Sequence, residues 1–104
     1  MAGEETTHNY QVTDKSYPKI AAKARLQIDK ISGEPILLYP EGLLKLNATG
    51  AAILGLCDGQ HSVQEIALEL ARQYKTTPAA IRSDVDEYLN TLYRHTLLEL
   101  HIRQ

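Results

Sequence analysis

The spacing of apolar residues changes once along this chain, at Asn47, and that change limits the possible folds more than any other feature. Before it, apolar and polar residues alternate over residues 25–29, as in a β-strand with one buried face. After it, apolar residues recur every three or four positions, as in amphipathic helices. The sequence therefore predicts an α+β domain in which a small sheet precedes the helices.

Three short strands are expected before Asn47. They cover residues 25–29, 36–39 and 43–46, and turn-forming residues separate them at 32–35 and 40–42. Because such short turns join neighbouring antiparallel strands, the strands should form an antiparallel meander. Three strands are about the minimum for a stable sheet, provided that something covers one face.

Three helices are expected after the strands. Asn47 is a suitable N-cap for a first helix that stops at Asp58-Gly59. A capping box over residues 62–65 opens a second helix, and Thr77-Pro78 opens a third that reaches about residue 95. The predicted fold class is a winged helix-turn-helix-like α+β domain, with a three-stranded antiparallel sheet followed by three helices.

The first 17 residues differ from the rest of the chain. They contain Val12 as their single Leu, Ile or Val residue, and they hold the whole formal net charge of −2. A segment this poor in apolar side chains cannot bury enough surface to offset its ordering entropy. Residues 1–17 are therefore expected to form a disordered acidic tail, and residues 18–104 a single domain.

The sequence also bears on compartment. Acidic residues replace the basic stretch of a secretory signal, and no apolar run approaches the ~20 residues that span a bilayer. The single cysteine, Cys57, cannot form an internal disulfide. A cytoplasmic protein without membrane contact is expected.

Catalysis and metal binding find little support in the sequence. Cys57, Asp58 and His61 are the nearest approach to a catalytic cluster, but Asp58-Gly59 already serves as a helix stop. The four histidines, of which His8 lies in the tail, lack the short spacing of zinc ligands. Neither an enzyme nor a cofactor is predicted.

A winged-helix fold raises the possibility of DNA binding, which stays open as an alternative. The third helix would have to carry bases toward phosphates. It contains Arg82 and Arg94 but also Asp84, Asp86 and Glu87. An acidic helix on a neutral body is a poor partner for a polyanion, so no nucleic-acid partner is expected.

The third predicted strand, at residues 43–46, is short and apolar around Lys45. An edge strand exposes unpaired N–H and C=O groups that another strand can use, and peptides bind some proteins in this way. The alternative is a short edge that Lys45 merely protects, as is usual in monomers. The residues alone leave both interpretations open.

A resemblance to a known family favours the first interpretation. Residues 36–47 (Ile-Leu-Leu-Tyr-Pro-Glu-Gly-Leu-Leu-Lys-Leu-Asn), 49–54 and 57–59 resemble the PqqD family of pyrroloquinoline quinone (PQQ) biosynthesis. Residues 63–66 and 84–89 fit the same pattern, so that the resemblance covers about residues 18–98. After the third helix the family often has glycine, whereas this chain has Arg94-His95-Thr96.

The resemblance implies a peptide chaperone and no catalyst. Members of this family bind the ribosomally made precursor peptide PqqA and present it to the radical SAM enzyme PqqE. In the wider class of leader-peptide recognition domains, the peptide adds to the third strand beside the third helix. A recognition domain for another modified peptide stays open as a further alternative, and a monomer or weak homodimer is expected. Carried onto this chain, the peptide-binding residues are Leu43, Leu44, Lys45, Leu46, Ile81, Asp84, Val85 and Tyr88.

Overall fold

The computed structural model of the protein describes residues 13–102. Its elements follow in the order β1 (Ser16–Ile20), β2 (Arg25–Ile28), β3 (Pro35–Tyr39), β4 (Gly42–Lys45), α2 (Ala48–Gly55), α3 (Val63–Gln73), α4 (Pro78–Arg94) and β5 (Leu98–Ile102). Strands β2, β3 and β4 form an antiparallel sheet in that order, and the three helices follow. The predicted fold class is confirmed.

The helices begin where the cap residues predict. The Asn47 side chain accepts a hydrogen bond from the Gly50 N–H at 2.7 Å. Ser62 and Glu65 form the reciprocal capping box at the start of α3, with bonds of 3.1 and 2.8 Å. Thr77 caps α4 in the same manner. Each cap joins residues three positions apart, which is why local sequence predicted it.

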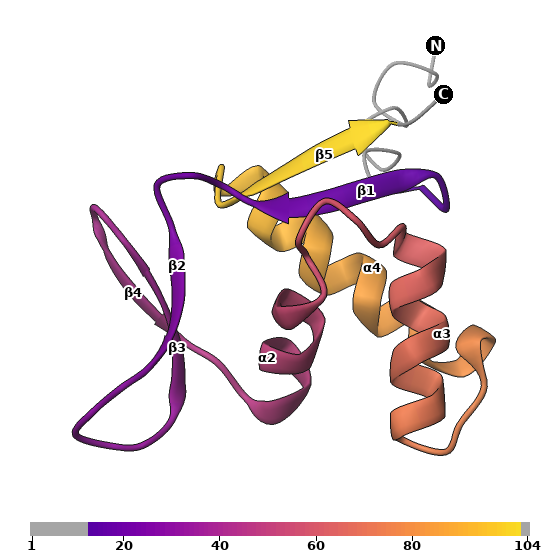
Figure 1. Cartoon of the computed structure of the whole chain (residues 1–104), viewed down its shortest axis with the longest axis horizontal. Coiled ribbons are helices and arrows are strands. Elements are labelled where there is room, and N and C mark those ends of the chain that lie inside the picture. Colours follow the sequence, from indigo (N-terminus) through magenta and orange to yellow (C-terminus); the bar gives the residue numbers. More distant parts are fainter. Residues whose placement is uncertain (1–12, 103–104) are drawn as a thin grey trace, which may run out of the picture.

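One apolar core joins the helices to the sheet. In Figure 1, α2 lies between the three-stranded sheet and α3, and α4 runs alongside α3. The apolar stripes of the helices face one another across this space, as their helical spacing requires. The largest fully buried side chains include Leu37, Ile53, Leu54, Ile66, Leu70, Leu89 and Leu92.

A second, two-stranded sheet was not predicted. Strand β1 pairs with β5 in antiparallel register, from Ser16 opposite Ile102 to Ile20 opposite Leu98. Figure 1 shows this ribbon lying across one end of the helices. The edge of β1 that faces away from β5 contacts the loop between α2 and α3, where the Ile20 N–H donates to the Cys57 carbonyl at 3.1 Å. The pairing joins segments about 80 residues apart, so no local pattern could indicate it.

The N-terminal boundary predicted at residue 18 needs correction. Ser16 and Tyr17 belong to β1, and the Ser16 side chain is fully buried. Asp14 forms an ion pair with Arg82 of α4. The ordered domain therefore includes residues that were assigned to the tail, because pairing with β5 stabilises a segment that has few apolar side chains of its own. The rest of the predicted tail, residues 1–12, lies outside the described residues.

Candidate functional site

Strand β4 is an edge of its sheet, and its register shows which backbone groups are open. The Leu46 N–H donates to the Pro35 carbonyl of β3 at 3.0 Å. Bonded and non-bonded pairs alternate along an antiparallel ladder, so Leu44 also bonds to β3. The N–H and C=O groups of Leu43 and Lys45 therefore point away from β3. Two donors and two acceptors are aimed at the space where another strand could lie.

The side chains of β4 alternate between two faces. Leu44 and Leu46 lie on the same face as the buried Leu37, toward the helices. Leu46 is buried, whereas 37% of Leu44 is exposed. Leu43 and Lys45 lie on the opposite face, and both are exposed. A strand added to β4 would therefore meet Leu44 on its helix-facing side.

Three adjoining cavities run along α4, and together we call them the α4 groove. Their volumes are about 250, 230 and 510 Å³. Asp84 and Tyr88 line the first two, and Thr91 lines the second and third. The wall that α4 and its C-cap residue supply consists of Asp84, Glu87, Tyr88, Thr91, Leu92 and His95. The opposite wall includes Tyr39, Glu41, Leu44, Asn47 and Gly50.

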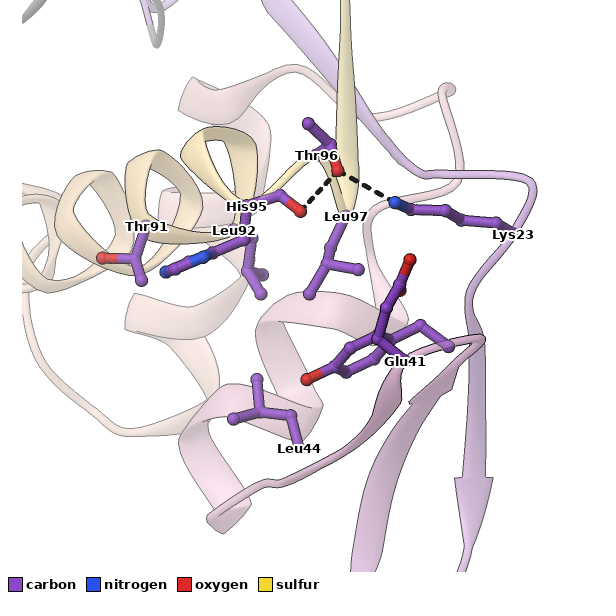
Figure 2. A pocket seen from close by; sticks show the side chains of 9 residues that line it. Lys23, Glu41, Leu44, Thr91, Leu92, His95, Thr96 and Leu97 are labelled. Carbon is purple, nitrogen blue, oxygen red and sulfur yellow. Dashed lines mark hydrogen bonds between the residues drawn. The ribbon is translucent and has the colours of Figure 1, made fainter.

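The two walls run in opposite directions along the chain. At one end of the groove Asn47 lies opposite Asp84, and at the other Leu44 lies opposite Thr91 and His95. Figure 2 shows the second end, where the side chains of Leu44, Leu92 and Leu97 point into a shared space beside the β3–β4 hairpin. The groove thus follows β4 and the chain that leads from it into α2.

The C-terminal end of α4 forms part of this wall in an unusual conformation. Thr96 has a positive φ of 59°, and the Leu97 N–H donates to the Leu92 carbonyl at 2.9 Å. These features form a helix C-terminal cap that glycine adopts more readily than a β-branched residue. The Thr96 hydroxyl accepts from the Lys23 ammonium at 2.9 Å and donates to the His95 carbonyl at 2.6 Å (Figure 2). These bonds hold the threonine in this conformation.

Tyr88 lies where α4 meets the start of α2. Its hydroxyl oxygen is buried, and among residues 13–102 it has no hydrogen-bond partner. A Cβ atom at position 50 would lie 2.5 Å from that oxygen, so Gly50 is what allows the ring to pack there. Burial raises the pKa of Tyr88, and the hydroxyl stays protonated at neutral pH.

Five of the eight predicted peptide-binding residues lie at the open edge or in the α4 groove. They are Leu43, Leu44, Lys45, Asp84 and Tyr88. The other three, Leu46, Ile81 and Val85, are buried members of the core. Their side chains pack inside the core of the described structure, and their contact with a peptide stays a prediction.

Several groove residues were not predicted, although the sequence contains a signal for them. Asp84, Glu87, Tyr88, Thr91 and His95 are spaced at 0, 3, 4, 7 and 11. This is helical spacing, and it describes a polar stripe beside the apolar one. Asp84 and Tyr88 of this stripe were predicted from the family resemblance, whereas Glu87, Thr91 and His95 were missed, because the sequence reading of this helix followed its apolar stripe.

Cys57 is placed unfavourably for nucleophilic chemistry. Only 3% of the residue is exposed, and its thiol donates to the Ile53 carbonyl at 3.3 Å. Burial, with a smaller effect of the neighbouring Asp58 charge, raises the pKa of Cys57 to about 12. Asp58 instead contacts His61 Nδ1 at 3.0 Å on the surface. This geometry supports a structural role for the cysteine.

We expect the Cys57 thiol of the folded protein to resist alkylation at pH 8. A pKa of about 12 leaves roughly one thiol in ten thousand ionised at that pH, and the thiolate is the reactive form. Iodoacetamide labelling followed by mass spectrometry should detect modification only after unfolding in denaturant. Glutathione labelled in parallel is the control, and labelling of the native protein at a comparable rate would contradict the assignment.

Residues 13–102 offer neither a metal site nor a membrane-spanning helix. No group of three or more His, Cys, Asp or Glu side chains in this range is placed to hold a metal ion. No helix in the same range is both long enough and apolar enough to cross a bilayer. The histidine of the predicted tail, His8, lies outside the described residues.

Sequence comparison identifies several similar proteins. A "PqqA binding protein" of Methylococcus capsulatus is 43% identical over 67 residues, which cover 64% of this chain and 70% of that protein. Another "PqqA binding protein", from Xanthomonas euvesicatoria pv. vesicatoria, is 35% identical and covers 86% of this chain and 97% of its own length. The match therefore includes nearly the whole of this second relative.

Solved structures and a family model agree with these relatives. One solved structure is the PqqD part of Methylobacterium extorquens PqqCD, described as a stand-alone recognition element for a ribosomally synthesized and post-translationally modified peptide (RiPP). It matches with a TM-score of 0.73 and 31% identity, over 85% of this chain and 94% of its own. PqqD of Xanthomonas campestris has a TM-score of 0.54 and 31% identity, over 85% and 98%. Residues 34–98 match the model of "Coenzyme PQQ synthesis protein D (PqqD)". With the fold, the open edge and this match taken together, the chain belongs to the PqqD family.

Proposed function

We propose that this protein binds the precursor peptide PqqA as an added strand on β4 and presents it to the radical SAM enzyme PqqE during PQQ biosynthesis. The observation that carries the proposal is the open edge of β4 beside the α4 groove. Relatives that are named PqqA binding proteins, and one described as a RiPP recognition element, support the choice of ligand.

The binding mode follows from the edge. The outward N–H and C=O groups of Leu43 and Lys45 would pair with the peptide backbone, which fixes its register. Peptide side chains on the helix-facing side would then enter the α4 groove and contact Leu44. Ion pairs at an exposed rim contribute only about 0–1 kcal/mol each, so burial of apolar side chains must supply most of the affinity.

In this proposal the protein does no bond chemistry itself. The buried thiol of Cys57 has a pKa of about 12, so the most nucleophilic side chain type stays protonated and unreactive at neutral pH. Binding takes place in the cytoplasm, where a ribosomally made peptide is released and where an unpaired cysteine stays reduced. The protein acts as a monomer or weak homodimer.

Calorimetric titration of the protein with synthetic PqqA tests the proposal. We expect saturable 1:1 binding with a dissociation constant in the micromolar range or tighter. A precursor peptide of an unrelated pathway is titrated as the control. Tighter binding of that peptide than of PqqA would indicate a recognition domain for another modified peptide. Absence of binding at tens of micromolar, with and without PqqE, would contradict the proposed function.

DNA binding is the less favoured alternative. The helix that would enter a groove of DNA is α4, and it carries the carboxylates of Asp84, Asp86 and Glu87. Its Arg82 is already paired with Asp86 and Asp14. Binding to a duplex that is strong at low salt and falls steeply as salt rises would support this alternative instead.

A further inference from the structure

The two ends of the α4 groove differ in chemistry. The open cavity of about 510 Å³ is lined by Leu44, Leu92 and Leu97, with the polar side chains of Lys23, Glu41 and His95 around them (Figure 2). Its volume lies in the range of small-ligand pockets. Toward the other end, the adjoining cavity of about 230 Å³ is lined by Asp84 and Glu87, and Asp84 also lines the end cavity of about 250 Å³. The three leucines suit one end to an apolar group, and there the charge of Glu41 is accompanied by that of Lys23, whereas Asp84 and Glu87 share their cavity with no basic side chain.

The carboxylates at the acidic end are available to a ligand. Within residues 13–102, neither Asp84 nor Glu87 takes part in an ion pair, whereas Asp86 on the same helix is held by Arg82 at 2.8 Å. Two unpaired carboxylates on one wall favour a cationic side chain over a neutral or acidic one. Such pairs add little affinity at an exposed site, but they discriminate between ligands.

The distance between the ends sets a spacing on the ligand. Leu92 follows Asp84 by eight residues along the chain, and His95 follows Glu87 by eight. Leu92 and His95 both line the cavity of about 510 Å³. Eight helical residues rise about 12 Å, which an extended strand covers in about four residues. Side chains of a strand alternate between its two faces, so two side chains enter the same groove only if they are an even number of residues apart.

From these observations, and resting on the function proposed above, we infer that the α4 groove selects a peptide segment with a large apolar side chain and a basic side chain four residues apart. The apolar side chain occupies the cavity beside Leu44. The Lys or Arg side chain lies between Asp84 and Glu87. Charge complementarity then fixes which stretch of the precursor binds and in which direction it lies.

Scanning of a synthetic PqqA peptide tests this selection. Each basic residue is replaced in turn by glutamine, and each large apolar residue by alanine, with affinity measured by calorimetry in about 50 mM and 500 mM salt. Loss of one basic residue should weaken binding about two- to fivefold in low salt and less in high salt. Loss of one apolar residue, four positions away, should weaken binding about tenfold in both.

Protein variants locate the two contacts through double-mutant cycles. Glu87→Gln and Asp84→Asn should weaken binding of the unmodified peptide, and should have no further effect on the peptide that lacks the sensitive basic residue. Glu34→Gln, on the distant β2–β3 turn, removes the same charge and serves as the control. Leu44→Ala should couple with the apolar residue, whereas Leu43→Ala, on the opposite face, should not.

The outcomes separate this inference from the proposed function. Coupling at both ends with a spacing of four supports the inference. Tight binding without coupling at either end, or with coupled residues at another spacing, overturns it and leaves the proposed function intact. Absence of binding between the unaltered protein and PqqA overturns both.

Discussion

Replacement of Lys45 by proline is expected to weaken PqqA binding about 100-fold or more without unfolding the protein. Proline removes an N–H that points away from β3 and places its ring where the added strand must lie. The lost hydrogen bond and the peptide carbonyl that stays unpaired together account for an effect of this size. Calorimetry gives the affinity, and circular dichroism with thermal unfolding checks the fold.

The opposite edge of the same sheet provides the matched control. Asp29 N–H donates to the Glu34 carbonyl at 2.8 Å, so by alternation the N–H of Ile28 on β2 also points outward. Ile28→Pro therefore makes the same chemical change at the other edge and should leave affinity within about twofold. Loss of binding in Ile28→Pro but not in Lys45→Pro would indicate that the peptide adds to β2 and not to β4.

Replacement of Leu70 by alanine is expected to lower the free energy of unfolding by about 2–5 kcal/mol. Leu70 lies on α3 with none of its surface exposed, and alanine would leave a cavity between α3 and the rest of the core. A domain of this size has about 5–15 kcal/mol of stability in total, so the melting temperature should fall by at least about 10 °C. Urea denaturation measures the change directly.

Leu68 on the same helix is the control for this substitution. It is 49% exposed, so Leu68→Ala removes the same atoms without opening a core cavity. We expect a loss below about 1 kcal/mol. Similar losses at the two positions would show that the buried face of α3 does not anchor the helix.

The elements whose signals are local were predictable from sequence. Asn47, Ser62 and Thr77 each cap a helix through a bond to a residue three positions later, and all three helices begin there. The alternation over residues 25–29 likewise predicted strand β2, but the buried face that it implied is not formed, since 37% of Leu26 and 62% of Ile28 is exposed. Local chemistry was therefore sufficient for the order of sheet and helices.

Long-range pairing limited what sequence could reveal. Strand β1 contains Pro18 and Lys19 and has no convincing alternation, and only its pairing with β5 makes it a strand. Prediction of the site residues was limited for a different reason. Ile81 and Val85, which are buried, lie on the same helix α4 as Asp84 and Tyr88, which line the groove. Helical spacing groups residues by face, but only tertiary packing decides which face is covered.

The β1–β5 ribbon has a consequence for how this domain can be joined to others. Ser16 and Ile102 lie opposite each other in its register, so the two ends of the domain leave from one place (Figure 1). A partner domain fused at either end would be tethered at the same point. A circular permutant that links these two ends and is opened at the β2–β3 turn would keep every strand pair, because the β1–β5 pairing already holds the two ends side by side.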